Sequence, residues 1–155
     1  MMFALDYSIS DRSKDRLLLR KYNIEEVTRS ILDFSDVFIG DVIIKDDRVD
    51  LSARWGWIPI LHFAGQFTRI ANDIGNLEDS EYEFTEYPHK IFFHREDNFV
   101  SITASYAPGT IRVGFEEFTL NVRKLLLNAL EDIKDLYPGI VNAPAIKEIE
   151  SSNLI

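Results

Sequence analysis

Apolar and polar residues alternate along several stretches of the chain, which is the pattern of half-buried β-strands. The alternation is clearest in Phe3 to Ile9 and in Phe99 to Tyr106, and both stretches are predicted to be strands. Further runs rich in Val, Ile, Phe and Tyr predict additional strands. These runs are Leu17 to Tyr22, Asp36 to Lys45, Arg48 to Ala53, Tyr82 to Glu86, Lys90 to Arg95 and Ile111 to Val113.

Turn-forming residues separate these runs. Asp46-Asp47 predicts a β-hairpin between the Asp36 and Arg48 runs, because aspartate favours tight turns. Glu96-Asp97-Asn98 predicts a turn before Phe99, and Ala107-Pro108-Gly109-Thr110 predicts one after Tyr106.

Two longer segments instead show the three-to-four-residue apolar spacing of an amphipathic helix. The first is predicted to open at Trp55 to Pro59, since proline is tolerated in a first helical turn, and to end at Gly75-Asn76. The second runs from Phe115 to Tyr137, where Glu116 and Glu117 complement the helix dipole. Two weaker helical segments are Ile24 to Phe34, which is either a short helix or irregular, and a helical turn after Pro144.

The order strands, helix, strands, helix predicts an α+β fold. Strands in consecutive hairpins are antiparallel, so we expect one antiparallel sheet of about five to six strands with two amphipathic helices packed on one face. The length of 155 residues fits a single domain, residues 1–155, with a peripheral tail from about residue 143. The other sheet face is expected to be solvated or covered by a partner. It would carry Glu81, Glu83, Thr85, Ser101, Thr103 and Ser105.

Charge and composition narrow the possible partners. The chain has 17 Lys and Arg against 26 Asp and Glu, which gives a formal net charge of −9. Such a charge disfavours nucleic acid and anionic membranes and favours a cationic partner. No Cys is present, which excludes a disulfide scaffold and a thiolate metal site. With no basic leader at the start and no run of roughly 20 apolar residues, a cytoplasmic location is expected.

No catalytic or cofactor motif occurs in the sequence. HExxH, GxSxG and glycine-rich phosphate loops are all absent. His89 and His94 are five residues apart on one predicted strand and therefore face opposite ways. Unless a bulge intervenes, they cannot share a metal ion or act as an acid–base pair. His62 lies off the apolar stripe of its helix, so a surface or boundary position is expected for it rather than a role as a ligand. We therefore predict no catalytic residue, no metal and no cofactor.

Acidic residues form two clusters in the sequence. One lies between Ile70 and His89, a stretch without Lys or Arg, and the other surrounds the first predicted hairpin. Each could be an ordinary solvated face, or the two together could form a continuous negative surface that recognises a cationic partner. The predicted partner-binding residues are Asp46, Asp47, Asp50, Glu78, Asp79, Glu81, Glu83 and Glu86.

Trp55-Gly56-Trp57 has two interpretations. Both indoles could cap the core, or one could be an exposed anchor at an interface, where tryptophan is over-represented.

Four segments of the chain carry a resemblance to a known group of proteins. They are Trp57 to Ala64, Tyr82 to Glu86, Val100 to Tyr106, and the Phe115 to Tyr137 helix with Pro138. Over roughly residues 36 to 142, the chain resembles a family of small uncharacterised bacterial domains, similar in size and acidity to the immunity proteins of toxin–immunity systems. The resemblance implies a role but transfers no functional residue.

The resemblance and the charge together suggest a non-enzymatic immunity protein that occludes the active site of a basic, nuclease-type toxin. The alternative is a small-molecule-binding or enzymatic α+β domain, with a pocket between sheet and helices near His89, His94 or Tyr106. A monomer or a weak homodimer is expected.

Overall fold

Seven antiparallel strands form two separate sheets in the computed structural model, which describes residues 2–11, 38–85, 87–137 and 144–151. The first sheet has the order β1-β2-β3 and the second has the order β4-β5-β6-β7. The predicted strand Leu17 to Tyr22 and the segment Ile24 to Phe34 lie outside the described residues. The strands are β1 (Ala4–Ile9), β2 (Ile39–Lys45), β3 (Ala53–Pro59), β4 (Ser80–Glu83), β5 (Lys90–Glu96), β6 (Phe99–Ala104) and β7 (Ala107–Gly114).

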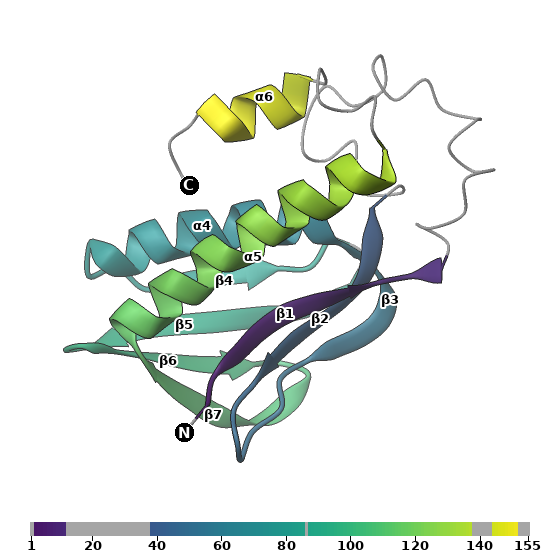
Figure 1. Cartoon of the computed structure of the whole chain (residues 1–155). Helices are drawn as coiled ribbons and strands as arrows, with labels where there is room; N and C mark the ends of the chain where they lie inside the picture. Colours follow the sequence, from purple (N-terminus) through teal and green to yellow (C-terminus); the bar gives the residue numbers. More distant parts are fainter. Residues whose placement is uncertain (1, 12–37, 86, 138–143, 152–155) are drawn as a thin grey trace.

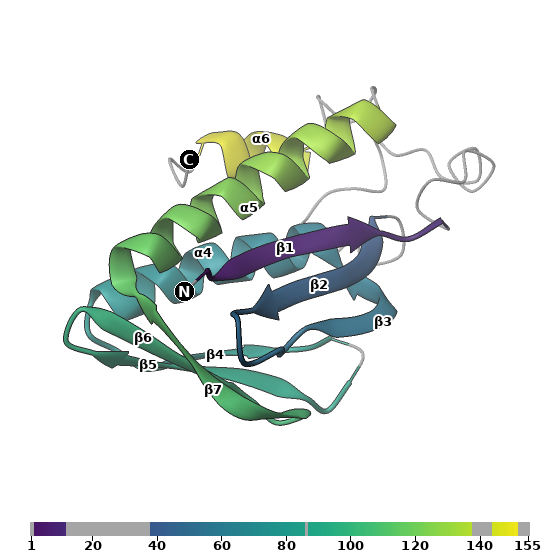
Figure 2. The ribbon, with the colours of Figure 1, turned by 60° about the horizontal axis from the view of Figure 1, so that its bottom comes forward.

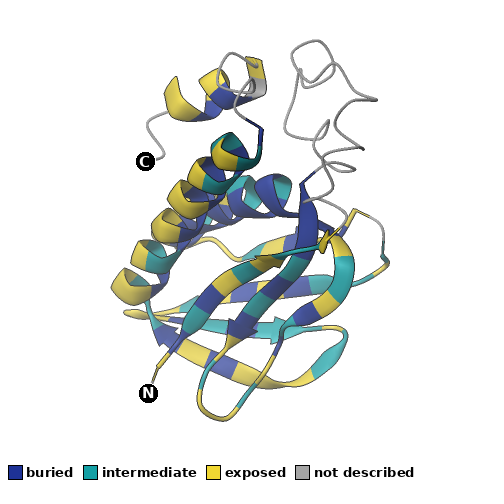
Figure 3. Ribbon diagram, turned by 45° about the vertical axis from the view of Figure 1, so that its right-hand side comes forward, coloured by how far each residue is buried: buried dark blue, intermediate teal, exposed yellow. Residues whose placement is uncertain are grey.

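The two long helices lie on the same side of both sheets and pack against each other (Figures 1 and 2). Helix α4 (Ile60–Gly75) contacts β2 to β5, whereas α5 (Phe115–Leu136) contacts β1, β6 and β7. The core lies between helices and sheets, and buried and exposed residues alternate along the strands (Figure 3). The predicted α+β class with antiparallel strands and two amphipathic helices is therefore confirmed.

The prediction of one sheet with five to six strands is wrong. Strand β3 leads directly into α4, and the chain then starts a second sheet at β4. The loop before β3 contacts the second sheet: the Tyr106 hydroxyl donates to the Leu51 carbonyl at 2.6 Å, and Val49 packs against Gly109. Alternation identifies the buried face of a strand but does not show which strand edges pair, so sheet number could not be read from it.

The segment from Trp55 to Pro59 is a strand and does not open the helix as predicted. It forms most of β3, and α4 begins at Ile60 with Pro59 as its N-cap residue. A bulge in β3 opposite Asp41 accommodates this segment. There Gly56 has φ +78° and donates its N–H to the Asp41 carboxylate at 2.8 Å.

Two turn boundaries also differ from the prediction. Residues 46–52, expected to contain a second hairpin strand, form mainly a loop before β3, joined to β2 by the bridge between Lys45 and Asp50. The turn after β6 lies at Ser105-Tyr106, and residues 107–110 belong to β7.

The apolar stripes predicted for the two helices are confirmed. Most of the core residues that α4 and α5 supply belong to these stripes. All stripe residues of α4 are buried, and so are those of α5 except Leu136, which is partly exposed. The stripe residues are Ile60, Leu61, Ala64, Phe67, Ile70, Ala71 and Ile74 of α4, and Phe118, Val122, Leu125, Leu126, Ala129, Leu130, Ile133 and Leu136 of α5. A further helix, α6 (Pro144–Ser151), follows the segment 138–143 and places Ile146 and Ile149 in the same core cluster.

Candidate functional site

The acidic residues around the first hairpin mainly support its loop. One Asp46 carboxylate oxygen accepts the N–H groups of Arg48 and Val49 at 2.8 and 2.7 Å. Asp50 accepts the Ser52 N–H at 2.9 Å and pairs with Arg54 at 3.2 Å. The Ser52 side chain is the main cause that lowers the pKa of Asp50, and the Ser52 N–H and Arg54 lower it further. Asp47 is exposed and, unlike Asp46 and Asp50, forms no hydrogen bond or ion pair with a described residue.

The second acidic cluster lies on and before β4, an edge strand of the four-stranded sheet. Glu78, Asp79, Glu81 and Glu83 are all exposed, whereas Tyr82 between the two strand glutamates is buried. The predicted shared face of Glu81 and Glu83 is therefore confirmed. Glu86 lies outside the described residues.

Of the carboxylates on this edge, one pairs with a lysine, one contacts a histidine ring, and two have no cationic partner among the described residues. Glu81 pairs with Lys90 at 3.3 Å, and Asp79 contacts the His94 ring at 2.6 Å. Both pairs are largely exposed, so water weakens them. Glu78 and Glu83 make no ion pair with any residue in the described ranges. The β4 edge therefore keeps a negative charge.

The structure does not join the two acidic clusters into one continuous surface. The hairpin loop lies beside β7, as the contact of Val49 with Gly109 shows, and β4 lies at the opposite edge of that sheet. Strands β5 and β6 separate the two edges. The expectation of a continuous negative surface is thus corrected to two acidic regions, of which only the β4 region is a strand edge.

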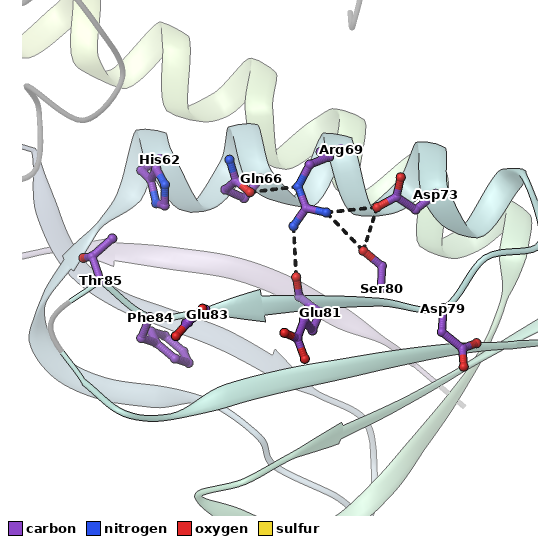
Figure 4. A pocket seen from close by; sticks show the side chains of 10 residues that line it. All are labelled: His62, Gln66, Arg69, Asp73, Asp79, Ser80, Glu81, Glu83, Phe84 and Thr85. Atoms are coloured by element: carbon purple, nitrogen blue, oxygen red, sulfur yellow. Dashed lines mark hydrogen bonds and ion pairs between the residues drawn. The ribbon is translucent and has the colours of Figure 1, made fainter.

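A polar groove of about 700 Å³ runs between β4 and the side of α4 that faces it (Figure 4). Its helical wall follows from the three-to-four-residue spacing of four polar residues on α4, namely His62, Gln66, Arg69 and Asp73. Its other wall comprises Asp79, Ser80, Glu81, Glu83, Phe84 and Thr85.

Arg69 occupies the end of this groove near Ser80. Its guanidinium donates to Gln66 at 2.9 Å, to Asp73 at 2.9 Å, to Ser80 at 3.3 Å and to the Glu81 carbonyl at 2.9 Å. Among the described residues that line the groove, Arg69 is the one Lys or Arg. Asp73 neutralises its charge, so the remaining carboxylates give the groove a negative charge.

A second, smaller hollow of about 340 Å³ lies on the outer face of the same sheet. Its lining is more apolar and includes Phe92, which is 42% exposed, together with His94 and Thr103. Asp79, Ser80 and Glu81 line both this hollow and the groove beside α4. Strand β4 is therefore a ridge with a hollow on either side.

Two buried polar atoms beside the groove have no hydrogen-bond partner among the described residues: His62 Nδ1 and the Tyr82 hydroxyl. Burial lowers the pKa of His62, and the nearby Arg69 charge lowers it further. Burial also raises the pKa of Tyr82. The sequence indicated the boundary position of His62 and the inward direction of Tyr82. It did not indicate that their rings would be neighbours, with centroids 6.1 Å apart.

The two tryptophans have different environments. Trp55 packs at the junction of the two sheets against Phe84, Tyr87, His89 and Tyr106, with ring centroids 4.5–5.4 Å away. Trp57 is 56% exposed, so the interpretation with one exposed indole fits and the one with both in the core does not.

The residues named for the enzymatic alternative do not all converge. His89 and Tyr106 contact each other beside Trp55, whereas His94 lies on the outer face with Asp79. The predicted opposite orientation of the two histidines is thus confirmed.

Among the described residues, no three His, Asp or Glu side chains are placed to hold a metal ion. No helix in this part of the chain is long and apolar enough to cross a membrane.

A scan against protein-family models finds no match for this chain, and searches of curated proteins and of solved structures find none either.

Proposed function

We propose that this chain is a non-enzymatic protein that binds a cationic protein partner. More specifically, we propose a cytoplasmic immunity protein that neutralises a basic, nuclease-type bacterial toxin by covering its active site. The observation that carries the proposal is the β4 edge, where Glu78 and Glu83 lack cationic partners among the described residues and a hollow lies on either side.

Electrostatics supports this function for two reasons. The net charge of −9 attracts a basic protein from a distance, and the β4 carboxylates would orient it during the encounter. A toxin site that binds phosphate backbones must itself be basic, so an acidic ridge is complementary to it. Inserting such a ridge would exclude nucleic acid without any chemistry by the inhibitor.

Exposed aromatic residues would provide the apolar part of such an interface. Phe92 lies in the outer hollow next to the β4 carboxylates. A large ring surrounded by charged groups is typical of an interface centre with a polar rim. We expect Phe92 to be covered by the partner and Glu81 and Glu83 to lie around it.

The polar character of the groove makes the small-molecule alternative less favourable. Ligand pockets are mostly apolar with a few polar groups, whereas this groove is lined chiefly by charged and polar side chains. In addition, Arg69 already uses its donors on neighbouring groups of the protein.

The first test measures partner capture and its charge dependence. The tagged chain is used as bait in a lysate of its source at low and moderate salt, and the captured protein is purified for kinetics. We expect one stoichiometric basic partner. The variant Glu81→Lys/Glu83→Lys should slow association by about tenfold at low salt and reduce the salt dependence.

Glu131→Lys/Asp135→Lys is the matched control, because it makes the same change in charge at exposed positions of α5. The control should retain most of the association rate. Equal rates for both double variants would remove the β4 edge from the proposal. Failure to capture any stoichiometric partner would contradict the binding function itself.

A further inference from the structure

Among the described residues, no strand pairs with one edge of β4. The hydrogen bonds of the other edge show which residues face outward. The Phe84 N–H donates to the His89 carbonyl on the β5 side at 3.2 Å. In an antiparallel ladder, such hydrogen-bonded positions alternate with positions whose N–H and C=O point away from the partner strand. Tyr82 and Ser80 therefore bond to β5, and the backbone groups of Glu81 and Glu83 point outward.

Arg69 confirms this direction and closes part of the edge. Its guanidinium reaches the outward Glu81 carbonyl at 2.9 Å. The Glu83 N–H and C=O form no hydrogen bond with any described residue, so the edge is open at that position. An open strand edge is a template for pairing with another extended chain.

The two hollows are placed where the side chains of an added strand would point. Successive residues of a strand project to opposite faces of the sheet. A strand paired with β4 would send one set of side chains toward the groove beside α4, and the other set toward the outer hollow that contains Phe92. Such alternating sites give specificity to strand addition, while the main chain provides the hydrogen bonds.

Charge determines the kind of strand that fits. Side chains on the outer face would lie next to Glu81 and Glu83, which favours Lys or Arg with aliphatic stems packed on Phe92. A second copy of this chain is disfavoured, because pairing β4 with itself would place these carboxylates next to each other.

We infer that an extended basic segment of the protein partner pairs with the open edge of β4 at Glu83, as a fifth strand of the second sheet. The inference rests on the proposed function and specifies its mode of contact. The segment carries Lys or Arg at alternate positions facing Glu81 and Glu83. Its other side chains are small or polar and face His62 and Gln66 on α4.

The test uses the whole chain and a capped octapeptide of alternating Lys and Thr. Two control peptides keep the same charge, one N-methylated at the Lys residues and the other at the Thr residues. In strand addition only one of these sets donates N–H groups to β4, so one methylated peptide should bind at least about tenfold more weakly than the other. Affinities are measured by NMR titration, and hydrogen exchange of the Glu81 and Glu83 amides should slow when the unmethylated peptide binds.

Weaker binding of the Lys-methylated peptide indicates antiparallel addition, and weaker binding of the Thr-methylated peptide indicates parallel addition. Either result supports the inference. Equal binding of the two would show attraction by charge alone and would overturn it, as would a failure of the unmethylated peptide to bind.

Two substitutions of Glu83 supply an independent check on the protein side. Glu83→Gln removes the charge and keeps the N–H, whereas Glu83→Pro removes both. Because this N–H is not part of the β4–β5 ladder, proline is compatible with the edge. The proline variant should bind the octapeptide several-fold more weakly than the glutamine variant, and equal affinities would contradict strand addition.

These outcomes are separable from those of the proposed function. If the peptides fail while capture of the basic partner still depends on Glu81 and Glu83, the strand-addition mode is wrong and the binding function stands.

Discussion

Tyr82, which is buried, and Tyr106, which is partly buried, differ in the hydrogen bonding of their hydroxyl groups. Burial raises the pKa of both. The Tyr106 hydroxyl donates to the Leu51 carbonyl and so links the second sheet to the loop before β3. The Tyr82 hydroxyl has no hydrogen-bond partner among the described residues. A hydroxyl removed from water contributes to stability only when it forms a hydrogen bond. The Tyr106 hydroxyl should therefore contribute more to the free energy of unfolding than the Tyr82 hydroxyl.

We predict that Tyr106→Phe lowers the free energy of unfolding by about 1 kcal/mol, because it removes the hydrogen bond that links the β6–β7 turn to the loop before β3. Tyr82→Phe is the matched control. It should change the free energy by less than about 0.5 kcal/mol in either direction, since it removes no bond to a described residue. Urea unfolding followed by tryptophan fluorescence measures both. A larger loss for Tyr82→Phe than for Tyr106→Phe would contradict this assignment.

Residue burial was the most predictable property of the candidate site. The alternation from Glu81 to Glu83 predicted two exposed carboxylates around a buried ring, and the structure confirms it. The sequence did not predict whether the Tyr82 hydroxyl forms a hydrogen bond. The neighbours of Tyr82 include His62 and Tyr106, which lie on other elements and approach it only in the folded chain.

At the scale of elements, the pairing of β1 with β2 depends on one glycine. Gly40 lies opposite Ile9 in the ladder and is buried. A Cβ atom at this position would lie 1.9 Å from the Ser8 carbonyl oxygen, far inside van der Waals contact. The Ser8 oxygen belongs to the backbone and cannot rotate away like a side chain. The clash could therefore be removed only by moving β1 and β2 apart.

We predict that Gly40→Ala lowers the free energy of unfolding by about 2 kcal/mol or more, or prevents folding, because the clash separates β1 from β2. Gly75→Ala is the control at the last residue of α4. Its nearest neighbour would be the Phe115 ring at 3.5 Å, an ordinary contact, so the variant should be as stable as the parent or slightly more so. Thermal unfolding by circular dichroism compares the two, and a fully stable Gly40→Ala would contradict the observed register.

The misassigned segment from Trp55 to Pro59 shows a limit of pattern analysis for elements. Its aromatic and branched residues suit a strand, yet Pro59 indicated a helix start, and both indications are correct for adjacent residues. The bulge at Gly56 disturbs the alternation that would have revealed the strand. Local periodicity therefore identified α4 and α5 well and identified this bulged strand poorly.

At the scale of the whole molecule, sequence patterns gave the fold class and missed the arrangement of the acidic clusters. Both clusters were visible as runs of Asp and Glu, but their separation is set by strand order. The hairpin loop lies beside β7 and the other cluster follows β4, at opposite edges of the sheet. Neither the periodicity nor the charge of a sequence shows the order of strands in a sheet. The structure was therefore needed to locate the β4 edge as the candidate binding site.

The C-terminal helix raises a further question at this scale, namely how strongly it is attached to the rest of the molecule. Ile146 and Ile149 of α6 are 0% and 4% exposed and belong to the core cluster. Lys134 of α5 also forms an ion pair with Glu150 of α6. This pair is partly exposed and adds little, so the two isoleucines should determine the attachment.

We predict that Ile146→Ala lowers the free energy of unfolding of the whole chain by about 2–4 kcal/mol, as for a core aliphatic residue. Lys147→Ala is the control, because Lys147 is exposed on the same helix, and it should cost less than about 0.5 kcal/mol. If α6 were only peripheral, Ile146→Ala would leave the urea midpoint unchanged and would speed hydrogen exchange in α6 alone. A single lowered transition would instead show that α6 unfolds together with the core, because its isoleucines complete that core.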